Sequence, residues 1–335
     1  MLKKKEAPEP YINIVSSIVA KGYRWRVIWN TLHYRPITET FHEFIIKMLL
    51  SFLFGEDWRK NEAEKPNERR HILLQWVYSY SDWTKRNMKP ENKDPESKLW
   101  EAIPTGEVQA LLLFAYDCYC LQIINKLPEH LIVRLKNSNT FQGARYEIAV
   151  AAVIARAGFA ITFLDDKLKS VRHCEFIAKH KQNGQEIGVE AKSKVRAGIL
   201  NEQGEAEVDK ELRANVQSLF RKARTQKPDG LPYLIFIDIN LPSTSGVPLT
   251  DKPWFKDIND MLDNYYSRFS STSDPFNALI FTNYSYHYGG NEGAAPSGEF
   301  AVYPTPSPET PIKDARILDC IIESLNRYPQ IPKEV

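Results

Sequence analysis

The chain has 335 residues, of which 43% are hydrophobic and 26% are charged, and its formal net charge at pH 7 is +2. This composition is typical of a globular protein with two domains or one large one. It excludes a strongly basic protein that binds nucleic acid through its overall charge, so any affinity for nucleic acid must come from a local basic patch. Four cysteines are too few for a disulfide framework, and the longest apolar run, 44–54, is too short to span a bilayer, so we expect a cytoplasmic protein that does not associate with membranes.

Residues 1–140 are predicted to form an all-helical region. Apolar side chains recur at helical spacing after Ile12, Thr38, Asn67 and Thr105. Aromatic residues in this region could stack on bases, but at helical spacing they more often belong to a core. The sequence leaves open whether the region recognises a substrate, holds a homodimer together or binds a partner protein.

A helix is predicted over residues 141–158, at the start of a second domain that spans 141–335. This helix is apolar on almost every side, so we expect it to be buried. Glu147 lies in one of its buried rows, and a buried carboxylate needs a cation, a hydrogen-bond donor or a metal-bound water. Arg145 or another nearby cation could form a salt bridge with it.

A β-hairpin is predicted around Asn183-Gly184, a dipeptide that suits a type I′ turn. Counting outward from this two-residue tip places Glu175 opposite Lys192. Side chains alternate along a strand, so Glu190 lies on the same face as both. The opposite face is predicted to be apolar, and it consists of Cys174, Phe176, Ala178, Ile187, Val189 and Ala191.

The polar face of this hairpin has the chemistry of a metal site. Two glutamates can share a divalent cation, and oxygen ligands are those that Mg²⁺ prefers. An adjacent lysine can stabilise negative charge or help to position an attacking water. The pattern of Glu175, fourteen intervening residues and Glu190-Ala191-Lys192 resembles the signature of the PD-(D/E)XK nuclease superfamily, although an isolated E-x-K on an exposed strand is common.

The resemblance implies an α/β fold with a restriction-endonuclease-like αβββαβ core and a mixed sheet. It implies that Glu175, Glu190 and the Ala191 carbonyl bind Mg²⁺ (or Mn²⁺), that Lys192 is catalytic, and that Glu147 tunes or completes the metal site. It also implies a nuclease acting on nucleic acid, DNA rather than RNA, with restriction, phage defence or repair as the roles that the family suggests. Glu175 stands where the family usually has an aspartate.

A basic helix is predicted over residues 208–224, followed by apolar strands at 231–239 and 277–281. Basic side chains on such a helix are often merely solvated, but beside a metal site they could contact phosphates. The candidate nucleic-acid-binding residues are Lys194, Arg196, Arg213, Gln217, Arg221, Lys222 and Arg224.

Two alternatives remain open at this point. Asp165-Asp166 could supply a metal ligand, although aspartates at such positions favour turns. The chain could also be a non-catalytic nucleic-acid-binding module, or a partner-activated assembly module, on the same fold. The non-catalytic nucleic-acid-binding module predicts salt-sensitive binding of nucleic acid without cleavage.

Overall fold

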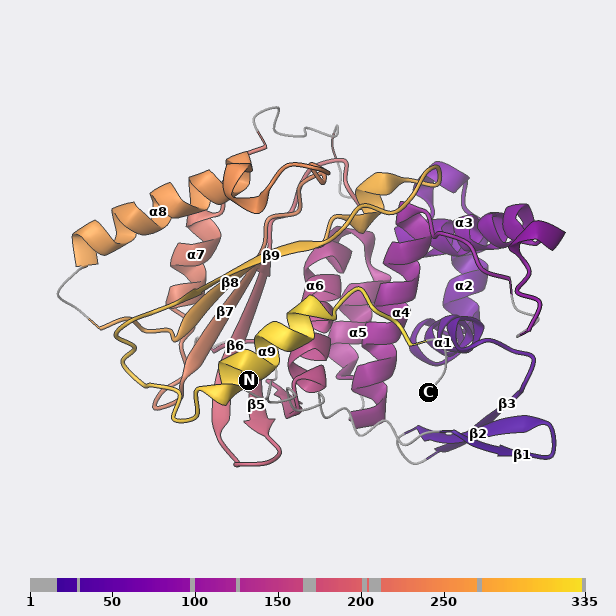
Figure 1. Ribbon diagram of the computed structural model, residues 1–335, viewed down its shortest axis with the longest axis horizontal. Coiled ribbons are helices and arrows are strands. Elements are labelled where there is room, and N and C mark those ends of the chain that lie inside the picture. The colour runs from indigo at the N-terminus through magenta and orange to yellow at the C-terminus, as the bar shows by residue number, and fades with distance from the viewer. Residues whose placement is uncertain are drawn as a thin grey trace, which may run out of the picture.

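The chain forms a mixed α/β structure with two β-sheets. The computed structural model describes residues 17–28, 31–96, 100–124, 127–164, 173–200, 204, 212–269 and 273–332. Within them, a small antiparallel sheet has the order β1-β2-β3, and a six-stranded mixed sheet has the order β4-β5-β6-β7-β8-β9 (Figure 1). The strands are β1 (Ile18–Ala20), β2 (Tyr23–Ile28), β3 (Thr31–Pro36), β4 (Phe159–Phe163), β5 (Phe176–His180), β6 (Glu186–Ser193), β7 (Tyr233–Asp238), β8 (Ala278–Asn283) and β9 (Glu299–Pro304).

The larger sheet contains the order of elements that the sequence predicted. Helix α6 (Ser138–Arg156) precedes β4, β5 and β6, and helix α7 (Gln217–Arg224) leads to β7. The pairs β4–β5 and β5–β6 are antiparallel, β6, β7 and β8 run parallel, and β9 is antiparallel to β8. The predicted helix–strand–strand–strand–helix–strand order and the mixed sheet are therefore confirmed.

The prediction of an all-helical N-terminal region was wrong. Its described part begins with β1, β2 and β3, and Lys21 and Gly22 have positive φ angles of 54° and 78° in the turn between the first two strands. The sequence of β2, YRWRVI, alternates basic and apolar residues with the period of a strand, which the helical interpretation missed. The helices that follow are α1 (Phe41–Met48), continued by a π-helical turn (Leu49–Phe54), α2 (Glu56–Ala63), α3 (Ile72–Asn87), α4 (Gly106–Ile124) and α5 (Glu129–Lys136).

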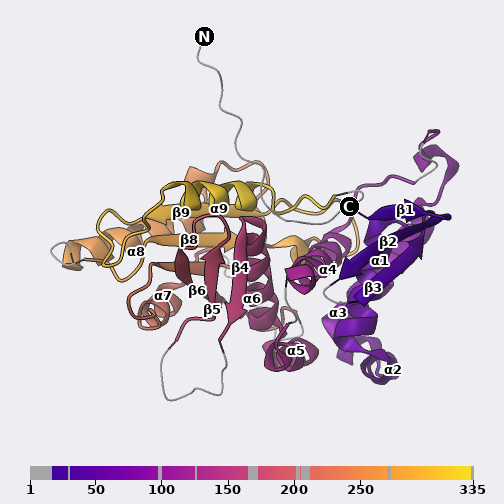
Figure 2. The ribbon, with the colours of Figure 1, turned by 90° about the horizontal axis from the view of Figure 1, so that it is seen from below.

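Helices α4 and α6 lie between the two sheets (Figures 1 and 2). One hydrophobic core joins α1, α3 and α4 to α6 and to the face of the larger sheet that α6 covers, and α9 (Arg316–Asn326) packs against α6. A second core fills the opposite face, where α7 and α8 (Pro253–Phe269) pack. Because the first core crosses residue 140, the regions 1–140 and 141–335 share apolar packing, and their division into domains stays a prediction.

The basic helix is shorter than the sequence predicted. It begins at Gln217, since Leu212 and Asn215 have left-handed backbone conformations with φ of 50° and 51°, which a helix cannot contain. Residues 208–211, the predicted start of this helix, lie outside the described residues.

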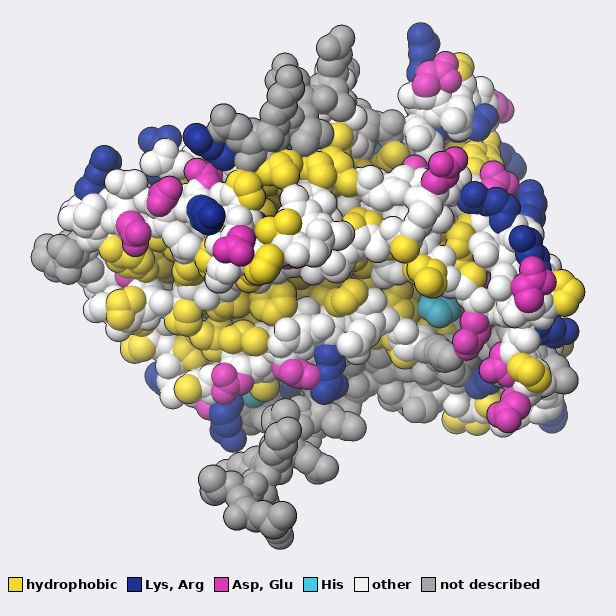
Figure 3. Space-filling view, turned by 45° about the horizontal axis from the view of Figure 1, so that its top comes forward, with side chains coloured by type: hydrophobic (Ala, Val, Ile, Leu, Met, Phe, Trp, Pro, Cys, Tyr) yellow, Lys and Arg dark blue, Asp and Glu magenta, His cyan; other side chains and the backbone are white. Residues whose placement is uncertain are grey.

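Charged side chains are scattered over the face that Figure 3 shows. On the face shown in Figure 3, hydrophobic side chains form a broad band, and Lys and Arg lie in small groups around it. In the part of the chain that the structure describes, no helix has the length and apolar character needed to cross a membrane. Binding of a polyanion would therefore depend on local groups of basic residues, as the net charge of +2 also indicates.

Candidate metal and phosphodiester site

The β5–β6 hairpin differs in register from the prediction. Phe176 pairs with Val189, a register that differs from the predicted one, in which Glu175 lay opposite Lys192. The tip is longer than two residues, since the N–H of His180 donates to the carbonyl of Gln185 at 2.8 Å. The pairing is displaced by two positions, and a displacement by an even number keeps each side chain of a strand on its face.

An irregularity at the start of β5 changes the position of one predicted core residue. The N–H of Glu175 donates to the carbonyl of Val189, and Phe176 is the residue paired with Val189. Glu175 and Phe176 therefore both lie opposite Val189, as in a β-bulge. Cys174 consequently lies in the second core, against Gly188, and not on the α6 side. The other predicted members of the apolar face are buried on the α6 side, as expected: Phe176, Ala178, Ile187, Val189 and Ala191.

Glu175, Glu190 and Lys192 gather at one site, as the sequence predicted. The Lys192 ammonium lies 3.1 Å from Glu175 Oε1 and also forms an ion pair with Glu190. The Glu190 side chain is fully buried, whereas Glu175 and Lys192 expose 18% and 21% of theirs. The site therefore has one fully buried carboxylate, while Glu175 and Lys192 keep a small exposed fraction.

Glu147 lies beside this site and is held by a residue that the sequence analysis did not identify. Arg134, on α5, donates to both carboxylate oxygens of Glu147, at 2.5 and 2.7 Å. This bidentate geometry is the strongest form of a salt bridge. Arg145, the suggested partner, instead lies near other acids and affects the pKa values of Asp117 and Asp238.

Replacing Arg134 by methionine should destabilise the fold. The variant keeps the length of the side chain but leaves the buried Glu147 carboxylate without its bidentate donor, so we expect a loss of about 3 kcal/mol at pH 8 in urea unfolding. The double variant with Glu147→Gln should recover most of this loss, because it removes the unpaired charge. A single variant as stable as the wild type would show that the pair contributes nothing.

The site holds three carboxyl groups, those of Glu147, Glu175 and Glu190, and two cationic side chains, those of Arg134 and Lys192. Burial raises the pKa of Glu190, and the carboxylates of Glu175 and Glu147 raise it further, against the opposing effect of Lys192. Burial and Glu175 likewise raise the pKa of Glu147. Burial disfavours the charged form of Lys192, but Glu190 and Glu175 outweigh it and raise the pKa of its ammonium. Lys192 is therefore a cation at neutral pH, and the carboxylates have a strong affinity for a further proton or cation.

The residues present fit a divalent cation with oxygen ligands. Both oxygens of Glu190 are buried; Oε1 forms the ion pair with Lys192, and Oε2 has no hydrogen-bond partner among the described residues. The carbonyl of Val189 points toward β5, and since carbonyls alternate along a strand, that of Ala191 points to the same side. No group of three or more His, Cys, Asp or Glu side chains within the described ranges could hold an ion. A cation here would therefore use two carboxylates, a carbonyl and waters, which is a common arrangement for Mg²⁺.

Two of the predicted nucleic-acid-binding residues, Arg196 and Arg224, make contacts within the fold. Arg196 is buried, and its guanidinium donates to the carbonyls of Asn240 at 2.6 Å and Ile239 at 3.0 Å. Arg224 lies over the ring of Tyr265, 4.3 Å from its centroid. Because its guanidinium is buried on these carbonyls, Arg196 is less available to a phosphate than the sequence predicted. The stacked Arg224 is less available than predicted.

The other predicted contacts lie on or near α7. This helix packs on β6 and β7, on the face of the sheet that carries Glu190. Lys194 donates to the carbonyl of Asn215 at 3.1 Å and is partly buried. The remaining four predicted side chains are exposed, namely Arg213, Gln217, Arg221 and Lys222.

The structure adds one acid that the sequence analysis did not single out. Asp238, on β7, is fully buried and accepts hydrogen bonds from Thr282, Ser193 and the N–H of Tyr284. An aspartate within an apolar strand is the signal that could have identified it. Asp238 lies on the α6 side of the sheet, so it does not join Glu190.

The rival ligands Asp165 and Asp166 lie outside the described residues. The site is thus defined by Glu147, Glu175, Glu190 and Lys192, with Arg134 as an added partner. Comparisons of this chain with protein-family models, with curated proteins and with solved structures found no match.

Proposed function

We propose that the chain is a metal-dependent nuclease of the PD-(D/E)XK type that hydrolyses phosphodiester bonds of nucleic acid, DNA rather than RNA. The observation that carries the proposal is the contact of one ammonium, that of Lys192, with two carboxylates, Glu175 and the fully buried Glu190. The order of elements from α6 to β7 agrees with the core that the resemblance implies.

Glu175, Glu190 and the Ala191 carbonyl would hold Mg²⁺ or Mn²⁺. When bound, such an ion acts as a Lewis acid toward the phosphate and lowers the pKa of a coordinated water. The charged Lys192 is positioned to neutralise negative charge that develops on the phosphate and to orient the attacking water. Glu147, fixed by Arg134, adds negative charge next to the ligands and so favours retention of the ion.

The substrate would approach along α7. Arg213, Arg221 and Lys222 are exposed there, on the side of the sheet that carries Glu190, and Gln217 lies among them. Arginine and lysine side chains fix the register of a nucleic acid through its phosphates without reading its sequence. The proposal therefore includes cleavage with little dependence on base sequence at these contacts.

The proposal is tested by incubating the purified full chain with linear, circular and single-stranded DNA and with RNA. We expect cleavage of DNA with Mg²⁺ or Mn²⁺ and none with EDTA. Independently of cleavage, Mn²⁺ should raise the melting temperature, because a ligand that binds only the folded state stabilises it. Absence of both cleavage and a metal-dependent shift would contradict the proposal.

One observation favours the alternative of a non-catalytic binding module. Lys192 forms ion pairs with both Glu175 and Glu190. In a non-catalytic protein these three side chains would form an ionic network that holds the hairpin together. Salt-sensitive binding of nucleic acid without cleavage under Mg²⁺ or Mn²⁺ would support this second function.

A further inference from the structure

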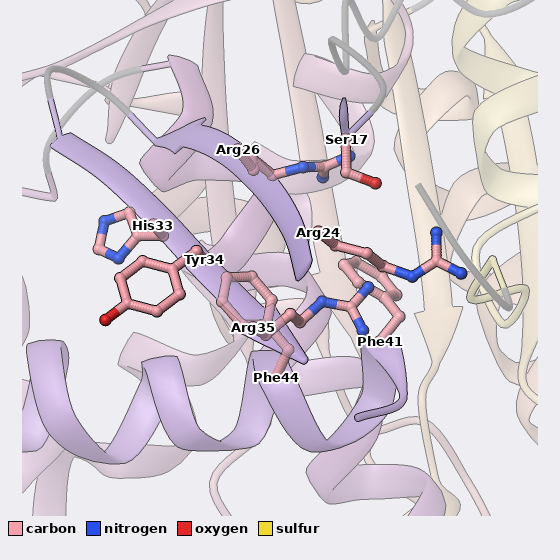
Figure 4. Close-up of a pocket in the computed structure, with 8 residues that line it drawn as sticks. All are labelled: Ser17, Arg24, Arg26, His33, Tyr34, Arg35, Phe41 and Phe44. Atoms are coloured by element: carbon pink, nitrogen blue, oxygen red, sulfur yellow. The ribbon is translucent and has the colours of Figure 1, made fainter. Parts of the chain in front are cut away.

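The small N-terminal sheet has the usual polarity of its two faces reversed. Arg24, Arg26 and Arg35 lie on its inner face. They line a cavity with Phe41 and Phe44 of α1, and Arg26 and Arg35 are buried (Figure 4). An antiparallel sheet at the surface of a protein normally packs its apolar residues inward and leaves its polar residues in water. Here the most polar side chains are on the inside.

The outer face of the same sheet is apolar and exposed. Residues directly opposite each other on adjacent strands share a face. By this register the outer face carries uncharged side chains, chiefly Ile18, Tyr23, Trp25, Val27, Leu32 and Tyr34. Four of them, Ile18, Val27, Leu32 and Tyr34, expose between 58% and 69% of their surface. In Figure 1 the sheet lies at the edge of the molecule, with α1 and α4 on one side of it.

The area of this face is close to what a specific protein interface requires. Judged from the exposed fractions, the five most exposed side chains of the face present roughly 500 Å² of apolar area. The largest apolar patch on a typical monomer covers about 300–600 Å² and is often functional. Two such faces packed together would bury about 1,000 Å² in total, which is the lower limit for a specific interface.

The face is also complementary to a copy of itself. Tyr23, Trp25 and Tyr34 form an aromatic cluster at one end, with ring centroids between 4.9 and 6.2 Å apart. Val27 and Leu32 pair at the other end, where the side chains are smaller. A two-fold axis between the sheets and perpendicular to the strands places the bulky end of one copy over the small end of the other. Since the face carries no charge, no like charges meet across the contact.

We propose that the outer face of the small sheet is the contact surface of a symmetric homodimer, in which two of these sheets pack face to face. Aligned packing of two sheets is a common way to bury apolar faces. A nucleic acid stacked on the rings would need cations beside them, and the outer face has none. The inference does not rest on nuclease activity, because the carboxylate site belongs to β5 and β6.

The test is sedimentation equilibrium of the purified full chain in EDTA, without nucleic acid. We expect the wild type to approach twice the mass of one chain as its concentration rises to about 100 μM. Val27→Glu should weaken dimerisation at least about 100-fold, because the interface would bury a carboxylate without a partner. Val27→Ile, which keeps the apolar contact, should remain dimeric. A wild type that is monomeric throughout this range would overturn the proposal.

The matched control is Val133→Glu on α5. Val133 and Val27 expose 57% and 60% of their surface, so the two variants add the same charge at equally exposed valines. Val133→Glu should change dimerisation less than twofold, as is usual for a surface substitution. Circular dichroism checks that both variants are folded. If both variants dissociate the dimer equally, the added charge does not act through the small sheet and the proposal fails.

Two further measurements identify what covers the face. The melting temperature of the wild type should rise with protein concentration, because association stabilises the folded state by mass action, and Val27→Glu should lose this dependence. Binding of a labelled single-stranded DNA oligonucleotide, followed by fluorescence anisotropy, should be unchanged in Tyr34→Ala. A monomeric wild type whose binding of the oligonucleotide requires Tyr34 would identify unpaired bases as the occupant and overturn the homodimer.

Discussion

Replacing Lys192 by alanine should reduce metal-dependent cleavage at least about 100-fold, the range seen when one stabilising donor is removed from an active site. The ammonium contacts Glu175 and Glu190, and under the proposed function it stabilises negative charge on the phosphate. The measurement is the initial rate of DNA cleavage under Mn²⁺ at saturating protein. Binding of the same DNA in EDTA should change little.

The matched control is Lys179→Ala on the same hairpin. Lys179 is exposed and pairs with Glu186 at 3.3 Å, so its loss removes an equal charge without touching the site. Because Lys192→Ala leaves two carboxylates unpaired, its fold must be checked by circular dichroism, and Lys192→Arg provides a second variant that keeps the charge. Retained cleavage by a folded Lys192→Ala protein would show that the lysine has no catalytic role.

Replacing Glu190 by glutamine should abolish cleavage and stabilise the protein at alkaline pH. The isosteric amide cannot serve as an anionic metal ligand, so the Mn²⁺-dependent rise in melting temperature should also be lost. At the same time the change removes a buried charge from a cluster in which the carboxylates of Glu147, Glu175 and Glu190 outnumber the cations Arg134 and Lys192. Loss of function with a gain in stability is the expected signature of a functional site.

The pH dependence of this gain has a definite sign. Burial raises the pKa of Glu190 in the folded state above its ordinary value of 4.5. As the pH rises from 4.5 toward the raised pKa, the unfolded chain releases this proton and the folded chain keeps it, so the wild type loses up to about 1.4 kcal/mol per pH unit. The melting temperature of Glu190→Gln should therefore exceed that of the wild type by at least about 3 °C at pH 8, with little difference at pH 4.5.

Glu186→Gln, on the exposed part of the same hairpin, is the control for this experiment. It should change the melting temperature by less than about 1 °C at either pH, since exposed ion pairs contribute little. A Glu190→Gln protein that is less stable than the wild type at pH 8 would mean that the ion pair with Lys192 outweighs the burial of its charge.

The common face of Glu190 and Lys192 could be predicted because it depends only on the alternation of side chains along β6. Glu175, Glu190 and Lys192 come together even though the pairing is displaced by two positions. The displacement itself could not be read from Asn183-Gly184, since a longer tip tolerates the same dipeptide. Cys174 lies on the side of the sheet opposite to the predicted one, because a bulge at Glu175 adds one residue to the strand. The sequence around Glu175 does not indicate this bulge.

The features that were missed depend on packing between distant segments. Arg134 reaches Glu147 from a separate short helix, so no local pattern links them. Arg196 looked like a surface cation, and only the chain beyond β7 shows that its guanidinium is buried against backbone carbonyls. The N-terminal sheet was missed for a different reason, because arginines occupy the inner positions of β2 and hide its alternation of buried and exposed side chains.

The hydrophobic core that crosses residue 140 also limits how this protein could evolve. Helices α4 and α6 pack into that core together, so a change in one alters the packing surface of the other. An ancestral recombination that exchanged the N-terminal part for an unrelated sequence would have left α6 without matching side chains.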